Sequence, residues 1–274
     1  MKTVVVTGST SGIGLAIATA FANEGANIIN GFGNTTEIEV IVERLGALSK
    51  AGAIYHPADM TKPAEISDLI ETAAKTFGGV NGLVNNAGLQ HVEKIEDFPI
   101  EEWDQILATN LSSSFHTMRA AIPLMKAKGH GRIINIASAN PSLLLHSKSA
   151  YVAAKDCVLG LTKTAAPELA ECGITVNAIC PRLRADAVCR QTDPGDGQGP
   201  RYDRGAGNDR SHPQSAADPR IRQGRRNWSA RRLFGEQRRS PSDLYLYLDR
   251  RRLDGGVTIS FGRQHHLYLR NEHA

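Results

Sequence analysis

Thr7-Gly8-Ser9-Thr10-Ser11-Gly12-Ile13-Gly14 is the stretch that decides the fold of this 274-residue chain. It follows the β-branched run Thr3–Thr7 and opens a helical pattern that starts near Gly12. Glycines here allow a tight turn and let backbone N–H groups approach a pyrophosphate at the helix N-terminus. A strand, a glycine turn and a helix in this order predict a nucleotide-binding βαβ unit.

Outward from this turn, strand and helix patterns alternate over residues 1–180. Such alternation predicts a Rossmann-type, doubly wound parallel sheet with helices on both faces. The expected strands are Thr3–Thr7, Ala26–Asn30, Ala53–Pro57, Gly82–Val84, Arg132–Ile136 and Ile174–Ala178. The expected helices start near Gly12, Thr35, Pro63, Glu101 and Ser149.

The net charge of +4 divides at the end of this pattern, into −4 over residues 1–180 and +8 over residues 181–274. We therefore expect a catalytic domain over 1–180 and an irregular, Arg-rich tail over 181–274, in which Leu244–Leu248 is the one regular-looking stretch. A basic tail could bind nucleic acid. However, its arginines have no lysine companions and no aromatic residues interleaved with them, so we expect no nucleic-acid partner.

Targeting and metal signals are weak. The apolar run after Met1 is too short for a signal peptide, and no stretch of ~18 apolar residues predicts a membrane span. The cysteines form no CxxC pair and no metal-ligand spacing. We expect reduced thiols, no metal and a cytoplasmic protein.

Five elements occur in a family-specific order: Gly8-x3-Gly12-x-Gly14, Asn85-Asn86-Ala87-Gly88, Asn110, Ser138 and Tyr151-x3-Lys155. Together they resemble the classical short-chain dehydrogenase/reductase family. The resemblance implies an oxidoreductase that uses a nicotinamide cofactor and forms a homotetramer.

Tyr151 and Lys155 lie four residues apart, so a helix presents both from one face. A free phenol has a pKa of ~10, and a neighbouring ammonium with a bound nicotinamide cation would lower it. Tyr151 could then take the proton of an alcohol. The resemblance implies that Lys155 holds the nicotinamide ribose, Ser138 binds the substrate oxygen and Asn110 links Lys155 to a water relay.

The cofactor is predicted to be NAD. Neither the glycine turn nor Asn30–Gly33 offers the Arg or Lys that a 2′-phosphate would need. The predicted cofactor-binding residues are Gly8, Thr10, Ser11, Gly12, Ile13, Gly14, Phe32, Asp59, Met60, Asn86, Ala87, Gly88, Tyr151 and Lys155.

The substrate class follows from a narrower resemblance, carried by the strings NNAGLQHV (85–92), DFP (97–99) and KSAYVAAK (148–155). These are similar to family members that interconvert D-3-hydroxybutyrate and acetoacetate. The resemblance implies that Gln90 and Lys148 bind the substrate carboxylate, a group that needs charge-assisted partners when buried. The substrate-binding set is completed by Ser138, Tyr151 and Asn140, which replaces the histidine usual in the family. Alternatives are another secondary alcohol, a 3-oxoacyl substrate, or an inactive product that only binds the cofactor.

The resemblance to the family ends at Cys180-Pro181. We interpret this abrupt end as the result of a displaced reading frame. When the codons are read one base later, Pro181–Asp209 can encode PGYVLTPFVDKQIPETAKARGMTEEQVMT and Asp243–Gly255 can encode ISTSISIDGGWTA, followed by a possible stop. Both strings resemble the family's C-terminal segments. We therefore expect the written chain to lack the last strand, the substrate lid and tetramer surfaces, and to be poorly soluble or inactive.

Overall fold

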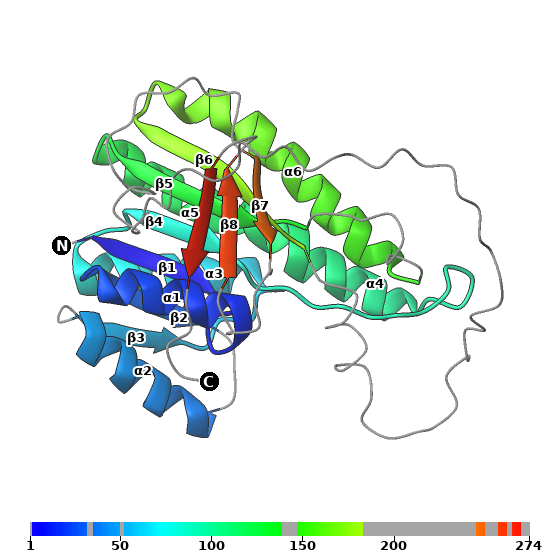
Figure 1. The fold of residues 1–274 in the computed structure, drawn as a ribbon, viewed down its shortest axis with the longest axis horizontal. Helices are drawn as coiled ribbons and strands as arrows, with labels where there is room; N and C mark the ends of the chain where they lie inside the picture. The colour runs from blue at the N-terminus through cyan, green and yellow to red at the C-terminus, as the bar shows by residue number, and fades with distance from the viewer. Residues whose placement is uncertain are drawn as a thin grey trace, which may run out of the picture. The chain divides into compact units, whose positions relative to one another are not determined.

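A computed structural model describes residues 2–31, 35–49, 52–138, 147–182, 245–249, 257–261 and 265–269. Its strands form one sheet in the order β3-β2-β1-β4-β5-β6-β7-β8-β9, parallel from β3 to β7 (Figure 1). The first six strands are β1 (Thr3–Thr7), β2 (Asn27–Gly31), β3 (Ala53–His56), β4 (Gly82–Asn85), β5 (Gly131–Ile136) and β6 (Ile174–Arg182). All six were predicted from the sequence, to within a few residues at their ends.

Helices connect these strands, and five begin at or next to the predicted residues. They are α1 (Gly12–Asn23), α2 (Thr35–Ser49), α3 (Pro63–Phe77), α4 (Ile100–Leu107), α5 (Ser113–Ala127) and α6 (Ser149–Ala170). Between α4 and α5 the helix continues as a π-helical turn, η1 (Ala108–Ser112). A π-turn inserts an extra residue per turn and is often found at functional sites.

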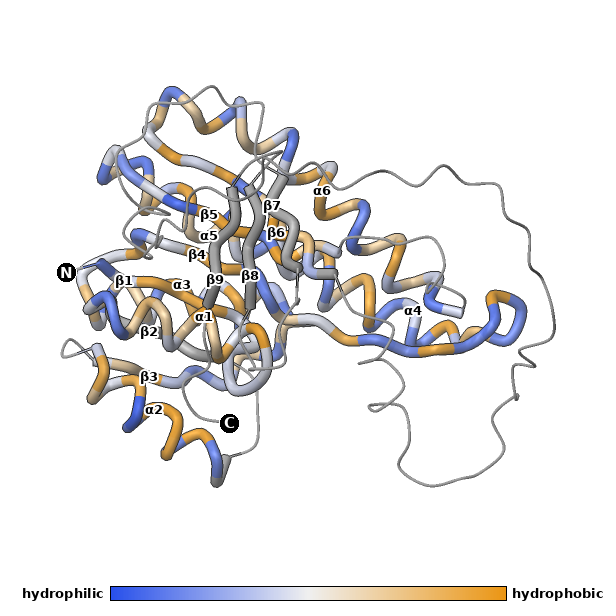
Figure 2. Tube along the Cα trace, in the orientation of Figure 1, coloured by the Kyte–Doolittle hydropathy of each residue, from blue (hydrophilic) through white to orange (hydrophobic). Residues whose placement is uncertain are grey.

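Two apolar layers cover opposite faces of the sheet, and successive residues of β1 alternate between them. Val4 and Val6 pack with α1, whereas Val5 packs with α3, α5 and α6. Figure 2 shows hydrophobic residues along β1 and alternating hydrophobic and hydrophilic residues along α2. Burial on both faces explains why the parallel strands read as continuous apolar runs.

The chain reverses direction across the sheet between β1 and β4, which are hydrogen-bonded neighbours. From β1 the chain continues to β2 and β3 on one side, and from β4 to β5 and β6 on the other. Ligands of open α/β sheets bind outside the carboxyl ends of the strands at such a switch point. The glycine turn and the segment after β4 meet there.

Leu244–Leu248, the one stretch of the tail expected to be regular, overlaps a strand, and two further tail segments that were expected to be irregular are strands as well. These are β7 (Tyr245–Asp249), parallel to β6, followed by antiparallel β8 (Val257–Phe261) and β9 (His265–Leu269). Aromatic and β-branched residues recur in these short runs, and both favour strands. The predicted lid falls between Arg182 and Tyr245, outside the described residues.

Candidate active site

The glycine turn joins the end of β1 to α1 and is locked to the segment after β4. Asn86 Nδ2 donates hydrogen bonds to the carbonyl oxygens of Thr7 (2.9 Å) and Gly8 (2.8 Å). A Cβ at Gly14 would overlap the Gly8 carbonyl oxygen and Asn86 Nδ2, and Gly8 itself has φ +62°. Close packing at Gly14 and the left-handed backbone at Gly8 both require glycine.

Thr7 fixes the other half of this junction. Its Oγ1 accepts hydrogen bonds from the backbone N–H groups of Asn86 and Ala87, each at 3.0 Å. The two motifs, separated by 78 or more residues in the chain, are therefore held together by hydrogen bonds. Five predicted cofactor-binding residues therefore lie together at the carboxyl ends of β1 and β4: Gly8, Gly12, Gly14, Asn86 and Ala87.

The N-terminus of α1 fits an anionic group. Ser11 is the N-cap but makes no side-chain capping hydrogen bond, and the first turn carries no acidic residue. A Cβ at Gly12 would meet nothing within 4 Å, so space is open there. Free N–H groups and the helix dipole favour a diphosphate at this end. The described residues thus fit a dinucleotide cofactor.

Asn110 lies in the π-helical turn and is tied to the segment that follows Gly88. Its Oδ1 accepts from the Leu89 N–H at 2.7 Å, and its Nδ2 donates to the Leu89 carbonyl at 2.9 Å. Asn110 is 1% exposed. A Cβ at Gly88 would lie 3.3 Å from Asn110 Oδ1 and 3.6 Å from Lys155 Nζ, so both side chains lie next to Gly88.

Tyr151 and Lys155 emerge from one face of α6, as predicted. Lys155 is buried, its Nζ donates a 2.7 Å hydrogen bond to the Ile136 carbonyl, and burial lowers its pKa to about 8. Burial raises the pKa of Tyr151, and a hydrogen bond with Ser138 partly offsets this.

In the chain alone, burial therefore raises the pKa of Tyr151, whereas the predicted lowering requires a bound nicotinamide cation together with Lys155. Lys155 Nζ lies 5.9 Å from the centre of the Tyr151 ring, over its face, and its hydrogen bond is directed to Ile136. The loss of hydration around the phenol then outweighs the stabilisation of its charged form.

The two residues predicted to bind the substrate carboxylate meet in the fold. Lys148 Nζ donates to Gln90 Oε1 at 3.3 Å, although 58 residues separate them in the chain. A backbone hydrogen bond of 2.8 Å from Glu93 N to the Ser147 carbonyl joins the same two segments. Lys148 immediately precedes α6, so the pair lies beside the helix turn that carries Tyr151.

Asp59 and Met60 follow β3, where a contact with adenine was predicted. The Asp59 carboxylate accepts from Thr61 N (2.9 Å) and Oγ1 (2.8 Å), which holds its pKa below the ordinary value, and it pairs with Lys62 at 3.4 Å. The Asp59 N–H donates to Glu65 Oε2 at 2.8 Å.

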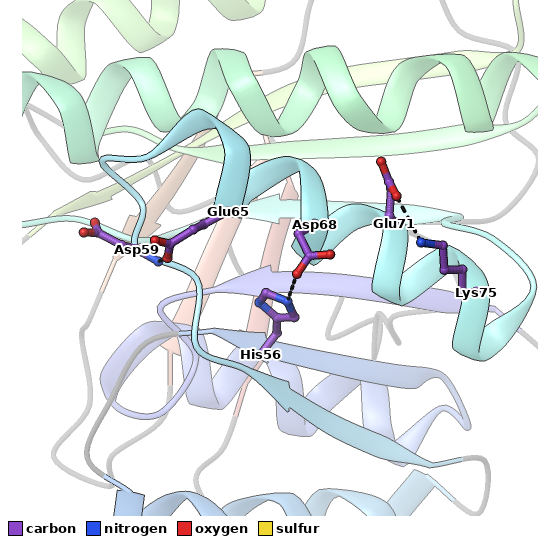
Figure 3. Close-up of polar contacts among 6 residues, drawn as sticks. All are labelled: His56, Asp59, Glu65, Asp68, Glu71 and Lys75. Carbon is purple, nitrogen blue, oxygen red and sulfur yellow. Dashed lines mark hydrogen bonds and ion pairs between the residues drawn. The ribbon is translucent and has the colours of Figure 1, made fainter.

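Figure 3 shows Asp59 and Glu65 beside His56 and Asp68, whose side chains lie 2.9 Å apart and link β3 to α3. The loop that carries Asp59 is thus built by local polar contacts, and Met60 beside it is buried.

Phe32 and Asn140, two further predicted site residues, lie outside the described residues. Sequence reasoning missed a buried chain of hydrogen bonds behind the site. Thr117 Oγ1 donates to Asn85 Oδ1 (2.7 Å), Asn85 Nδ2 to Asn135 Oδ1 (2.8 Å), and Asn135 Nδ2 to Thr162 Oγ1 (2.9 Å). The available signal was an asparagine inside each of two apolar strands, since buried amides need partners.

The described part of the chain holds neither a candidate membrane helix nor a candidate metal cluster. No helix there is both long and apolar enough to cross a lipid bilayer. No group of three or more His, Cys, Asp or Glu side chains there could hold a metal ion.

Comparison with known proteins assigns the class that this fold and site define. The sequence model of the short chain dehydrogenase family matches residues 2–192, so the chain belongs to that family and is an oxidoreductase. Members of the family normally use a nicotinamide cofactor.

Two relatives show which members of the family this chain is similar to. The chain is 62% identical to a D-beta-hydroxybutyrate dehydrogenase of Rhizobium meliloti (strain 1021) over 181 residues, which is 66% of this chain and 70% of the relative. It is 55% identical, again over 181 residues, to a protein of the same name from Cupriavidus necator, covering 66% and 69%. A crystal structure assigned to a short-chain alcohol dehydrogenase of Sinorhizobium meliloti 1021 superposes with a TM-score of 0.62 at 30% identity, covering 66% of this chain and 71% of that one.

Proposed function

We propose that residues 1–180 form the cofactor-binding and catalytic part of an NAD-dependent dehydrogenase that interconverts D-3-hydroxybutyrate and acetoacetate. The observation that carries this proposal is the Lys148–Gln90 contact of 3.3 Å beside the first turn of α6. It supplies one cation and one amide, which together suit a small carboxylate next to Tyr151. The similarity to two D-beta-hydroxybutyrate dehydrogenases supports the same substrate class.

When bound, NAD supplies a hydride acceptor. The residues of the chain orient the hydroxy acid and move its proton. Lys148 and Gln90 hold the carboxylate, and Ser138, which already hydrogen-bonds Tyr151, also binds the hydroxyl oxygen. Tyr151 removes the hydroxyl proton as the carbon–oxygen double bond forms. Lys155 holds the ribose, and Asn110 fixes Leu89 beside it.

The preference for NAD over NADP rests on charge. Ser9, Thr10 and Ser11 form the described turn, and none could neutralise a 2′-phosphate. We expect NAD to be used with the higher kcat/KM. A preference for NADP would contradict this part of the proposal and leave the substrate class untouched.

The substrate is tested by NADH production from a panel of 3-hydroxy acids and of secondary alcohols that lack a carboxylate. Loss of a charge-assisted hydrogen bond worth about 1.5–3 kcal/mol lowers the rate about 10- to 100-fold. Lys148→Met should therefore lower kcat/KM for D-3-hydroxybutyrate by that factor and change it little for the neutral alcohols.

Lys75→Met, an exposed lysine paired with Glu71 on α3, is the matched control and should leave both rates unchanged. Tyr151→Phe provides the inactive reference. Equal losses of Lys148→Met activity on acids and neutral alcohols, or a better 3-oxoacyl substrate, would overturn the 3-hydroxy acid assignment.

We further propose that residues 1–180 followed by the tail read one base later (the shifted product) form a cytoplasmic homo-oligomer, a tetramer by the family resemblance, whereas the written chain is not expected to form that tetramer. The cysteines of the described residues, Cys157, Cys172 and Cys180, are free thiols, as suits a reducing compartment. Ile95, Ile100 and Phe115 expose large apolar side chains, which offer surface for a second copy. Light scattering after size-exclusion chromatography tests assembly, and a monomer at micromolar concentration would contradict it.

A further inference from the structure

The loop after β3 lies at the same edge of the sheet as the glycine turn. β3 is two strands away from β1 in the order β3-β2-β1-β4, so the carboxyl ends of β3 and β1 lie about 10 Å apart. Tyr151 lies on the other side of β1, on α6, which packs on β5 and β6. When the diphosphate binds at the start of α1 and the nicotinamide faces Tyr151, the adenosine half of the cofactor is therefore expected beside the loop after β3.

Within this loop, the Asp59 carboxylate offers a hydrogen-bond acceptor to a ligand. Its Oδ1 is taken by Thr61, which donates from its N–H at 2.9 Å and from its Oγ1 at 2.8 Å. Its Oδ2 makes a long, 3.4 Å ion pair with Lys62, and the Asp59 side chain is 41% exposed. Oδ2 can therefore accept a further hydrogen bond. Adenine carries an exocyclic amino group, a donor that suits a carboxylate oxygen.

Glu65 holds the main chain of this loop. Its Oε2 accepts a 2.8 Å hydrogen bond from the Asp59 N–H, six residues earlier in the chain. Its Oε1 forms a 3.0 Å ion pair with Lys62, the same lysine that pairs with Asp59. Figure 3 shows the Glu65 carboxylate on the backbone side of Asp59 and the Asp59 carboxylate directed away from it. The main chain and the side chain of Asp59 are thus fixed by different partners.

An acidic residue at the third position of a helix usually serves the helix itself, because it accepts from the backbone N–H of the N-cap residue. In α3 the N-cap residue is Lys62, and its N–H already donates to the Asp59 carbonyl oxygen at 3.0 Å. Glu65 instead reaches three residues further back, to Asp59. The contact therefore fixes the shape of the loop, and the negative charge also suits the start of α3.

Glu65 is ionised in this arrangement. The hydrogen bond from the Asp59 N–H and the Lys62 ammonium hold the pKa of the Glu65 carboxyl below its ordinary value. Lys62 pairs with both carboxylates and offsets the repulsion between them. Since one Glu65 oxygen is engaged by the main chain and the other by Lys62, Oδ2 of Asp59 is the better acceptor for a ligand.

We propose that Glu65 is a positioning residue for the adenine half of the cofactor. By fixing the Asp59 main chain, it directs the Asp59 carboxylate towards the exocyclic amino group of the base. Glu65 acts through Asp59 and does not bind the base itself. The inference rests on the dinucleotide cofactor of the proposed function, but not on its substrate or on the choice between NAD and NADP, because both cofactors carry the same base.

Discrimination between two bases tests this role through binding alone. The shifted product, which keeps residues 1–180 unchanged, is titrated by calorimetry with NAD and with nicotinamide hypoxanthine dinucleotide, in which a carbonyl oxygen replaces the amino group. We expect the parent to bind NAD about 10-fold or more tightly, as loss of a charge-assisted hydrogen bond implies. Glu65→Ala should lower this preference by about 3-fold or more and leave the Kd of the hypoxanthine dinucleotide within about 2-fold. The Glu65 side chain is 39% exposed, so its variants should fold.

Three further variants separate positioning from a structural role. Glu65→Gln keeps an oxygen that can accept the Asp59 N–H, so it should retain the preference within about 2-fold. Glu71→Ala removes an exposed ion pair with Lys75 on the same helix and should change neither Kd. Asp59→Ala should lose the preference. Adding Glu65→Ala to it should cause no further loss, because the two residues act through one contact.

Equal weakening of both dinucleotides by Glu65→Ala would show that this residue only supports the fold, and would overturn the proposal. A parent that does not prefer NAD to the hypoxanthine dinucleotide would overturn it as well, and so would a further loss of preference in the double variant. Inactivity towards D-3-hydroxybutyrate with the base preference intact would instead refute the substrate assignment alone.

Discussion

Lys155 Nζ donates a 2.7 Å hydrogen bond to the carbonyl oxygen of Ile136, the last residue of β5. The contact joins the face of α6 that carries Tyr151 and Lys155 to the carboxyl end of the sheet. It also holds an ammonium group in a site where it is 4% exposed, so that its pKa falls to about 8. The position proposed to hold the ribose is thus one in which the positive charge is poorly hydrated.

This burial predicts a specific dependence of stability on pH. Between about pH 8 and the ordinary lysine pKa of 10.5, the folded chain has released the Lys155 proton while the unfolded chain still binds it. Unfolding free energy should therefore rise with pH across that window, by up to about 3 kcal/mol from this group, and the benefit should be absent below pH 8. Urea unfolding of the shifted product at pH 7.5 and 10 measures the rise.

Lys155→Met should remove this rise, whereas Lys75→Met should keep it because Lys75 is exposed. An unchanged rise in Lys155→Met would show that another group is responsible.

Gly14→Ala should destabilise the shifted product by about 1–3 kcal/mol, because the new methyl group overlaps the Gly8 carbonyl oxygen and Asn86 Nδ2. It should also weaken NAD binding in fluorescence titration, since the turn must move. Gly160→Ala is the control: it lies inside α6 with nothing within 4 Å of a new Cβ, so it should stabilise by about 0.5–1 kcal/mol. A Gly14→Ala variant that unfolds and binds like the parent would show that this packing is not required.

Thr162→Val should cost about 1–3 kcal/mol, because Asn135 Nδ2 loses its 2.9 Å acceptor inside the protein. Thr164→Val is a close match two residues along α6, with the same hydroxyl-to-backbone bond to the fourth preceding residue but an exposed side chain. It should change the unfolding free energy by less than about 0.5 kcal/mol. Equal effects of the two variants in urea unfolding would remove the buried amide chain as the explanation.

The written chain should be poorly soluble or inactive, and the shifted product should reduce NAD with the proposed hydroxy acid. The physical reason is that apolar surface left uncovered where the substrate lid and tetramer surfaces are expected costs ~25 cal/mol per Å², against a net stability of ~5–15 kcal/mol. The two products are compared by soluble yield and by NADH formation per mole of protein. Full turnover by a soluble written chain would contradict this prediction.

The element order from β1 to β6 was predictable because each element is specified by neighbouring residues. Val4-Val5-Val6 marks a strand buried on both faces, and Pro63 starts α3 where a missing N–H has no cost. The π-helical turn around Asn110 was not predictable, since its pattern differs from a regular helix by only one residue. Of the three tail strands, β7 overlaps Leu244–Leu248, the stretch expected to be regular, whereas β8 and β9 were missed because each is a short run in a polar context.

The sequence by itself determined the nucleotide-binding turn, the parallel sheet and the spacing that puts Tyr151 and Lys155 on one helical face. All three depend on residues close together in the chain, where backbone geometry leaves few alternatives. Only the tertiary structure decided that the Tyr151 pKa rises, that Lys148 reaches Gln90, and that Asn86 locks the turn 78 residues before it. Hydration and contacts between distant segments set these properties, and both exist only once the chain has folded.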